Sequence, residues 1–391
     1  MKSLIIIFGI YLILEIIIFV IIRNLKFSKW IITKNNLFEL FNKVKFLKFK
    51  KTNYSLQLGW DKKPNYKNFE TNKKIKTFYS INSKGYRNSK FDKRKNAIAT
   101  FGDSYTFCRQ VNDADTWQEI ISRNKKIFVS NYGVGNYGLD QAYLKFNFKF
   151  NKINCKEIIF GIVPETICRV QSSWKNYLEF GNLHGFKPYC EYKNNNILIH
   201  PNPLKKNSTF KDIKNIIALS KQKDRFYKDK YLKYFFKFPF IISFFHNFTF
   251  NINILSKYLF VKKKELINFD ETVFPIVMNA NIKLSHRLYN ETYSINLMKK
   301  LFEKINKDLL KKKITCHFVI FPQLFDLKLS TRVNYQNLYK GLSNKMNIID
   351  LTNSFLQKKN FEKLFTNDKY GGHLNKKGNI FVAKIIQKKL N

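Results

Sequence analysis

The 391-residue sequence is poor in cysteine, and its cysteines show no pairing pattern. There are five of them, irregularly spaced, and no Cys-x-x-Cys pair occurs; they are Cys108, Cys155, Cys168, Cys190 and Cys316. A disulfide framework or a cysteine-based zinc site needs regular pairs. The sequence therefore implies neither, and we expect free, mostly buried thiols, no metal site and no cofactor.

Acidic residues are also scarce. The chain has 27 of them against 71 lysines and arginines, which gives a formal net charge of +44. Such a charge suits nucleic acid, anionic lipid or acidic polysaccharide. Lysine is spread over the whole chain together with much Asn, Ile and Phe, which is typical of a compositional bias, and no zinc-finger spacing or RNP-like aromatic pattern accompanies it. We expect no nucleic-acid partner and favour a membrane or a glycan.

Only one long hydrophobic run occurs. Leu4 to Ile22 is almost entirely apolar, with Glu15 as its single charge, and would span about 28 Å as a helix. No small-x-small cleavage site follows, so we favour a single-pass membrane anchor over a cleaved signal peptide. An ionised Glu15 would cost about 2–3 kcal/mol there, which predicts that it is protonated or meets a helix partner. The side of the membrane on which the remaining chain lies stays open.

The chain divides into an anchor (residues 1–28), a basic and aromatic lead-in (29–94) and a large domain (95–391). In that domain strands alternate with helices, except in an insertion at about residues 170–290, which we expect to cap the site. Predicted strands are Ile98–Phe101, Ile127–Val129, Ile158–Val163, Cys316–Phe321 and Ile348–Leu351. Predicted helices include Thr116–Arg123, Tyr293–Lys312, Tyr335–Lys345 and one from Lys376 to Leu390. This pattern predicts a three-layer α/β sandwich with a mostly parallel five-stranded sheet.

A serine stands just past the first predicted strand, in Gly102-Asp-Ser104. Ligands of parallel sheets bind outside the carboxyl ends of the strands, and a serine nucleophile needs a base within hydrogen-bond reach. Of the six histidines, only His373 lies in a Gly-flanked loop that leads into a helix of the regular pattern. We predict Ser104 as nucleophile and His373 as general base. The alternative is an ordinary turn serine and an exposed histidine.

Three other side chains near these turns have predicted roles. The carboxylate of Asp103 is expected to bond nearby loop amides. Arg109 and Arg169 are candidates for binding an anionic substrate group, and solvated surface arginine is the alternative for each.

Three blocks together resemble the SGNH (GDSL-type) hydrolase family. They are Gly102-Asp-Ser104, the loop Asn131-Tyr-Gly-Val-Gly-Asn136 after the second strand, and His373-Leu-Asn375 near the C-terminus. The resemblance covers about residues 80–169 and 295–391. It implies the SGNH fold, Ser104 as nucleophile, His373 as base, and an oxyanion hole made by the Ser104 N–H, a second-block N–H that falls at Asn136, and a third-block asparagine.

The sequence departs from the family in two places. No asparagine stands near Pro164–Thr166, so Thr166 or Arg169 is the candidate substitute. The family's acid would fall at Tyr370, and Asp368 two residues earlier is the candidate triad acid, with a backbone carbonyl and a Ser–His dyad as the alternative.

The sequence predicts a membrane-anchored SGNH-like serine esterase, acting on an ester such as an O-acetyl group of a carbohydrate. Its partners would be the acylated glycan and the membrane. An O-acyltransferase that uses the same site on a surface or lipid-linked glycan is the first alternative. A catalytically silent glycan-binding or scaffold protein is the second.

Overall fold

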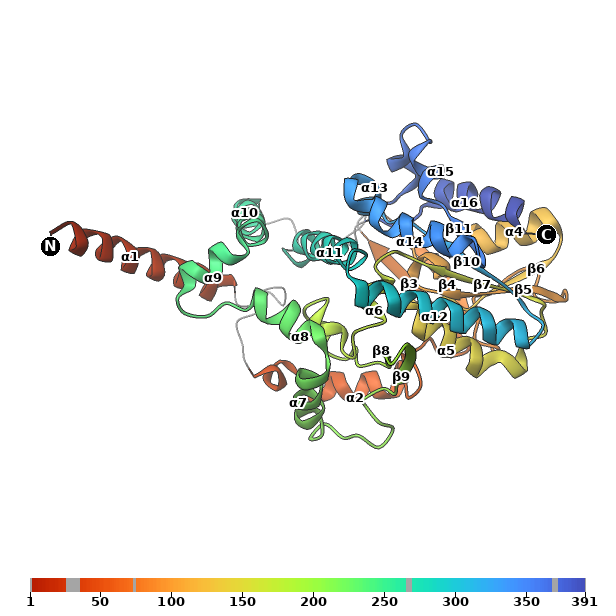
Figure 1. Cartoon of the computed structure of the whole chain (residues 1–391), viewed down its shortest axis with the longest axis horizontal. Coiled ribbons are helices and arrows are strands. Elements are labelled where there is room, and N and C mark those ends of the chain that lie inside the picture. The colour runs from red at the N-terminus through yellow and green to blue at the C-terminus, as the bar shows by residue number, and fades with distance from the viewer. Residues whose placement is uncertain (1, 26–35, 73–74, 265–268, 368–371, 391) are drawn as a thin grey trace.

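The structure, a computed structural model, describes residues 2–25, 36–72, 75–264, 269–367 and 372–390. It begins with helix α1, which projects away from the rest of the described chain (Figure 1). Helix α1 runs from Lys2 to Leu25, and its residues 2–23 are long and apolar enough to cross a membrane. Most of its side chains are exposed in the protein.

The core of the large domain is a sheet of five parallel strands in the order β11-β10-β7-β5-β6. Numbered along the chain, this is the flavodoxin-like order 2-1-3-4-5. The predicted α/β sandwich with a parallel five-stranded sheet is confirmed. The strands are β5 (Asn96–Gly102), β6 (Phe128–Asn131), β7 (Glu157–Ile162), β10 (Thr315–Ile320) and β11 (Asn347–Asp350).

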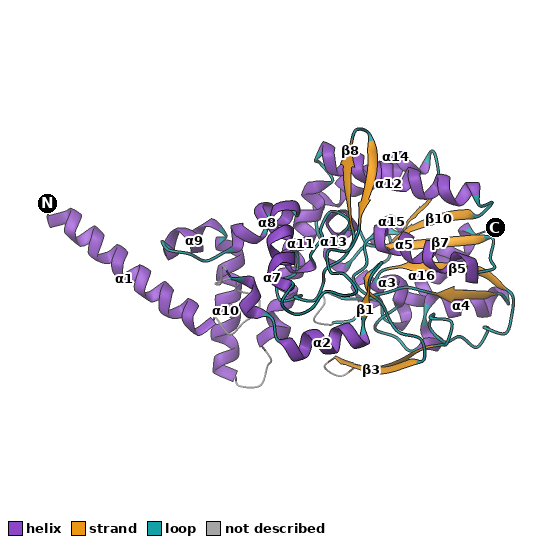
Figure 2. Ribbon diagram, turned by 90° about the horizontal axis from the view of Figure 1, so that it is seen from below, coloured by secondary structure: helices purple, strands orange, loops and turns teal. Residues whose placement is uncertain are grey.

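Helices cover both faces of this sheet (Figure 2). Alternate residues of a strand point to opposite faces. In β7, Ile158 and Phe160 belong to one buried cluster, which includes side chains of α5, α12 and α14. Ile159 belongs to a second cluster with side chains of α4 and α16. These helices are α4 (Trp117–Lys125), α5 (Leu139–Lys149), α12 (Thr292–Lys311), α14 (Val333–Ser343) and α16 (Lys376–Lys389).

The predicted elements of the sheet layers lie within one or two residues of the observed ones at most ends. Thr116 is the N-cap of α4, because its hydroxyl accepts a hydrogen bond from the Glu119 N–H. Asn375 is the N-cap of α16, and its side chain accepts from the Gly378 N–H.

The lead-in and the insertion hold more regular structure than their weak periodicity predicts. In both regions, short strands pair as antiparallel hairpins. The pairing of neighbouring segments, and not a long apolar stripe, therefore sets where these strands lie. The lead-in holds α2 (Lys43–Thr52), β1 (Tyr54–Ser55), β2 (Gly59–Trp60), β3 (Tyr66–Asn72) and β4 (Ile75–Ile81). The insertion holds β8 (Tyr189–Lys193), β9 (Asn196–His200), α7 (Ile213–Lys223), α8 (Arg225–Asp229), α9 (Phe240–His246), α10 (Phe248–Lys264) and α11 (Phe269–Leu288). Short helices fill four further turns: α3 (Ser104–Phe107), α6 (Thr166–Arg169), α13 (Leu324–Lys328) and α15 (Thr352–Leu356).

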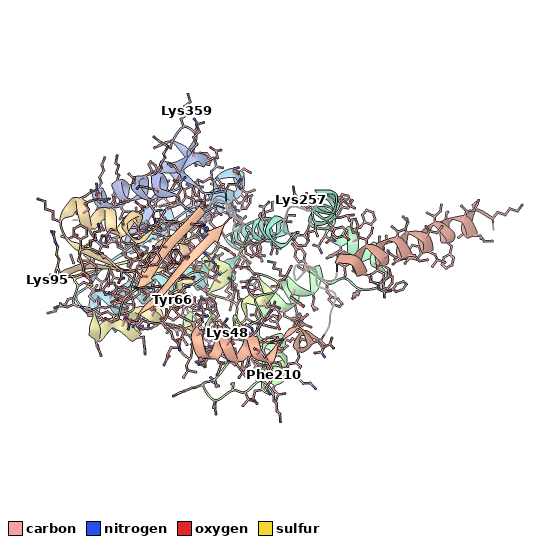
Figure 3. All side chains as sticks on the ribbon, turned by 180° about the vertical axis from the view of Figure 1, so that it is seen from behind. Lys48, Tyr66, Lys95, Phe210, Lys257 and Lys359 are labelled. Atoms are coloured by element: carbon pink, nitrogen blue, oxygen red, sulfur yellow. The ribbon has the colours of Figure 1, made fainter. Side chains whose placement is uncertain are left out.

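Basic side chains are spread over the molecule. Lys48, Lys95, Lys257 and Lys359 lie on widely separated parts of it (Figure 3). The five cysteines are free, and only Cys155 is not fully buried.

Two glycines stand side by side where β5 and β7 end. Gly102 pairs with Gly161, and a Cβ atom on Gly102 would lie 1.8 Å from the Gly161 carbonyl oxygen and 2.4 Å from Thr106 Oγ1. We expect Gly102→Ala to lower the free energy of unfolding by about 2–4 kcal/mol, because backbone must move to admit the methyl group. Denaturant unfolding of the detergent-solubilised chain measures it.

The matched control is Gly341→Ala in α14, where a Cβ atom would meet nothing within 4 Å. Alanine is the better helix former, so this variant should be unchanged or more stable by up to about 1 kcal/mol. Equal stability of the two variants would contradict the close approach of β5 and β7.

Candidate active site

Ser104 and His373 meet at the carboxyl end of the sheet. Strand β5 ends at Gly102, and Ser104 is the first residue of α3. Its Oγ lies 2.9 Å from Nε2 of His373, in the segment that precedes α16. The two residues are only 6% and 7% exposed, so the pair is largely withdrawn from bulk water. The structure thus brings together the two side chains that the sequence singles out.

The backbone around His373 is tied down on two sides. Thr366 N–H donates to the His373 carbonyl (2.7 Å), and His373 N–H donates to Thr366 Oγ1 (3.2 Å). The hydroxyl of Tyr105 donates to the Gly372 carbonyl (2.8 Å), and its ring centroid lies 5.1 Å from that of His373. Tyr105 follows Ser104 directly, so the α3 turn that presents Ser104 also positions His373. Asp368, the predicted triad acid, lies outside the described residues.

Asp103 joins the ends of two neighbouring strands. Its Oδ1 accepts from Tyr105 N–H (2.8 Å) and its Oδ2 from Val163 N–H (2.9 Å), just past β7. The predicted bonds to loop amides are therefore present. The carboxyl is fully buried, and burial raises its pKa. The charge of Arg169, whose Nη1 lies 3.6 Å from Oδ2, and the two hydrogen bonds from N–H groups oppose that rise in pKa.

Arg169 lies inside the protein, not on its surface. Its Nη2 donates to Glu165 Oε2 (2.7 Å), and its Nη1 donates to the Tyr137 carbonyl (3.2 Å). Burial raises the pKa of Glu165, against the opposing charge of Arg169. The guanidinium therefore balances two buried carboxyls, those of Asp103 and Glu165, and the surface alternative for this arginine is wrong.

The other two predicted oxyanion residues occupy neighbouring turns. Asn136 has a left-handed backbone (φ +69°) in the loop between β6 and α5. Thr166 begins α6, and its Oγ1 accepts from Leu139 N–H (2.9 Å), which fixes the start of α5. Among the described residues, nothing accepts a hydrogen bond from the N–H of Ser104, the N–H of Asn136 or the hydroxyl proton of Thr166. All three remain available as donors.

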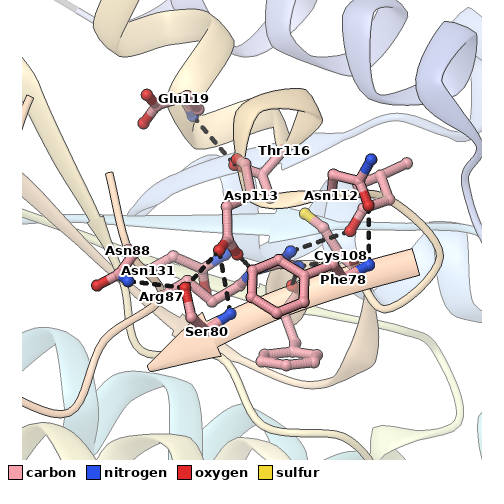
Figure 4. A network of polar contacts seen from close by, with 12 residues as sticks. Phe78, Ser80, Arg87, Asn88, Cys108, Asn112, Asp113, Thr116, Glu119 and Asn131 are labelled. Atoms are coloured by element: carbon pink, nitrogen blue, oxygen red, sulfur yellow. Dashed lines mark hydrogen bonds and ion pairs between the residues drawn. The ribbon is translucent and has the colours of Figure 1, made fainter. Parts of the chain in front are cut away.

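A buried arginine holds the segment that follows α3. Arg87 donates to the carbonyls of Phe107 (2.6 Å) and Val111 (2.9 Å) and pairs through Nε with Asp113 (2.7 Å). Asp113 in turn accepts from the N–H and hydroxyl of Ser80 in β4. Figure 4 shows the contacts of Asp113 with Arg87 and Ser80, which join the β3–β4 hairpin of the lead-in to the segment that follows α3. Sequence reasoning missed Arg87. The one feature of the sequence that could have indicated it is that residues 79–87 come shortly before the first strand of the sheet.

A cavity of about 350 Å³ opens beside these turns, lined by the lead-in, the β6–α5 loop and the insertion. Its lining includes Arg109 and Asn136, but neither Ser104 nor His373. The lining cations are Lys62, Arg109 and Lys175, the only lining carboxylate is Asp61, and Phe49, Trp60 and Phe107 supply aromatic surface. Asp61 pairs with Lys145 (2.7 Å) and Lys175 with Glu179 (2.9 Å), so the positive charge of the lining comes from Lys62 and Arg109.

Within the described residues, no group of three or more His, Cys, Asp or Glu side chains could hold a metal ion. No protein-family model matches the chain, and no curated protein matches its sequence. Among solved structures, a protein assigned to the G-D-S-L lipolytic family, from Desulfitobacterium hafniense DCB-2, is similar at 9% identity. The match covers 75% of this chain and 99% of that chain, with a TM-score of 0.36.

Removal of the Asp103 charge tests the support of the site. Asp103→Asn keeps the shape of the side chain but turns an NH2 group toward one of two buried N–H donors and leaves Arg169 without one counter-charge. We expect the free energy of unfolding to fall by about 2–4 kcal/mol. The control is Asp115→Asn, because among the described residues Asp115 forms an ion pair only with Lys376, whose side chain is 67% exposed. That variant should lose less than about 1 kcal/mol, and an equal loss in both would refute the role given to Asp103.

Proposed function

We propose that the protein is a membrane-anchored serine esterase that acts through an acyl-enzyme on Ser104. The observation that carries this proposal is the 2.9 Å contact between Ser104 Oγ and His373 Nε2 at the carboxyl end of a parallel sheet. A serine hydroxyl is a weak nucleophile by itself, and a neutral imidazole in that position accepts its proton as the oxygen attacks. The contact unites residues 269 positions apart, so local sequence alone does not produce it.

The reaction runs in two displacements. Ser104 Oγ bonds to the ester carbonyl carbon while its proton passes to His373 Nε2. The tetrahedral intermediate collapses, the ester C–O bond breaks, and the leaving alcohol takes the proton from the imidazolium. Water, deprotonated by the same imidazole, then attacks the acyl carbon. The bond between that carbon and Ser104 Oγ breaks, the acid leaves, and the imidazolium returns its proton to Oγ. We propose Asp368, five residues before His373 in the sequence, as the acid that orients the ring.

The oxyanion formed in each displacement needs preorganised donors. We assign this role to the Ser104 N–H, the Asn136 N–H and the Thr166 hydroxyl, because no described residue accepts their protons. The left-handed backbone of Asn136 supports this assignment, since turns with such residues form concavities of N–H groups that bind anions.

We place the non-reacting part of the substrate in the basic cavity. Its cations suit a carboxylate or a phosphate, and its aromatic rings suit the apolar face of a sugar. The substrate class that fits best is therefore an O-acylated, anionic glycan, with Arg109 as one of its ligands.

Acyl transfer to a glycan hydroxyl is the second candidate. It is favoured by the low exposure of Ser104 and His373, because a site that admits little water lets an alcohol compete for the acyl-enzyme. The ratio of free acid to transferred ester, measured with and without an added glycan acceptor, separates the two candidates.

Covalent labelling tests the nucleophile. The purified full chain should react with a fluorophosphonate probe, and Ser104→Ala should not, because the probe bonds to an activated serine oxygen. His373→Gln should label more slowly by about 10²-fold or more, since the base is lost. The control is Ser173→Ala, a buried serine of the insertion, which should label as the wild type does. A folded wild-type protein that stays unlabelled would refute the enzyme, and leave a binding or scaffold protein.

A comparison of charged and neutral substrates tests whether Arg109 in the cavity binds an anionic group. Arg109→Gln should raise KM about tenfold for the acetate ester of a sugar acid and leave kcat nearly unchanged, because one charge-assisted hydrogen bond is lost in the ground and transition states alike. The acetate ester of the matching neutral sugar should show unchanged kinetics. An equal effect on both esters would show that Arg109 acts through structure and does not bind the anion.

A further inference from the structure

Helix α9 of the insertion is apolar, and it is not buried in the protein. Its seven residues, Phe240–His246, include none that is buried. Four large apolar side chains in and beside it are strongly exposed: Phe238 (67%), Ile242 (63%), Phe245 (61%) and Phe248 (47%). Such a surface needs a partner or an apolar solvent.

The helix packs against α1 through its own N-terminus. Glu15 Oε2 accepts from Phe240 N–H (2.7 Å), and Glu15 Oε1 accepts from Ile241 N–H (3.2 Å). The rings of Phe19 and Phe240 lie 5.6 Å apart. Glu15 is only 5% exposed, although it belongs to a helix whose other side chains are mostly exposed. The single charge within the apolar run therefore has a helix partner, one of the two outcomes expected from the sequence.

The contact continues along the second half of α1. An apolar cavity of about 80 Å³ separates Ile18, Ile21 and Ile22 of α1 from side chains before and within α9 and α10. Ile22 is 8% exposed. Helices α9 and α10 thus cover one side of α1 from Glu15 to Ile22, and both views place α9 beside α1 (Figures 1 and 2).

The depth of this contact follows from helix geometry. Glu15 precedes Arg23, the last residue of the apolar segment, by eight positions. At 1.5 Å per residue, Glu15 lies about 12 Å along the axis from that end. If α1 crosses a bilayer with Arg23 at one surface, the first turn of α9 lies within the hydrocarbon layer, where water cannot satisfy its N–H groups.

We propose that α9 is a re-entrant membrane helix that dips into the bilayer beside α1, with lipid acyl chains covering Phe238, Ile242, Phe245 and Phe248. Seven residues are too short to cross, so the chain returns to the side it came from. The Glu15 carboxylate supplies the acceptors that the leading N–H groups of α9 need in a medium without water. Lys237, next to this surface, has a long stem that brings its ammonium to the lipid headgroups.

This assignment requires that α1 remains in the mature protein. The buried Glu15 and Ile22 support that requirement, because a cleaved α1 would leave two N–H groups of α9 without their acceptor and expose the apolar side of α10. The proposal concerns the membrane surface only. It does not depend on the reaction at Ser104.

A lipid-quenching experiment tests the location of α9. Phe245→Cys carries a bimane label in the full chain, reconstituted in phosphatidylcholine–phosphatidylglycerol nanodiscs. The matched control is Leu310→Cys in α12, because Leu310 is 60% exposed, nearly as Phe245 is. Unsubstituted protein gives the background from Cys155, the half-buried native thiol.

Doxyl-labelled lipid should quench the label at position 245 at least about threefold more than the label at 310, and aqueous iodide should show the reverse order, because only the former lies among acyl chains. Equal quenching at both positions would overturn the proposal. So would an intact mass that lacks residues 2–25.

The variant Glu15→Leu distinguishes the pairing of Glu15 with α9 from the insertion of α1 into the membrane. The substitution makes α1 more apolar, so α1 still inserts, but the leading N–H groups of α9 lose their acceptors. The expected result is a loss of the lipid quenching at position 245, while carbonate extraction still leaves the protein in the membrane. Retained quenching would show that Glu15 does not hold α9 in the bilayer.

Discussion

The buried carboxyl of Asp103 is the interaction on which the site depends. It accepts N–H groups from the turn after β5 and from the end of β7, and it faces the guanidinium of Arg169. These contacts fix where the α3 turn stands relative to the sheet. Ser104 is presented by that turn, and Tyr105, in the same turn, holds the backbone at Gly372 beside the base. The buried carboxyl of Asp103 thus positions Ser104 directly and His373 through Tyr105.

Much of the fold could be predicted from local pattern. Strand β7 is buried on both faces and reads as a continuous apolar run, and α12 carries a regular stripe of leucine and isoleucine. The hairpins β3–β4 and β8–β9 could not be found in this way, because their strands pair with each other and carry no continuous apolar run. Strand β4, for example, buries the polar Thr77 and Ser80 together with Tyr79 and Ile81. The β3–β4 hairpin is tied to a distant segment through Asp113, which accepts from Ser80 of β4 and from Arg87.

The site was predictable where chemistry and position agree locally. Ser104 follows a strand, and His373 precedes a helix, and each pattern can be read in about ten residues. The role of Arg169 could not be read, since its partners Asp103 and Tyr137 come from other strand ends. The sequence also left two outcomes for Glu15, and the choice between them depends on a helix 225 residues away.

The separation of Ser104 and His373 has a consequence for biosynthesis. The ribosome completes β5, β6 and β7 long before it reaches the histidine, 269 residues after the serine. The last helix must also dock, since Asn379 of α16 accepts from Trp117 N–H of α4 and so seats the segment before it. A nascent chain therefore holds Ser104 without His373 over the 269 residues that separate them, about two-thirds of a 391-residue synthesis. The contact between Ser104 Oγ and His373 Nε2 can form only when translation is almost finished, so the site is among the last parts of the fold to be completed.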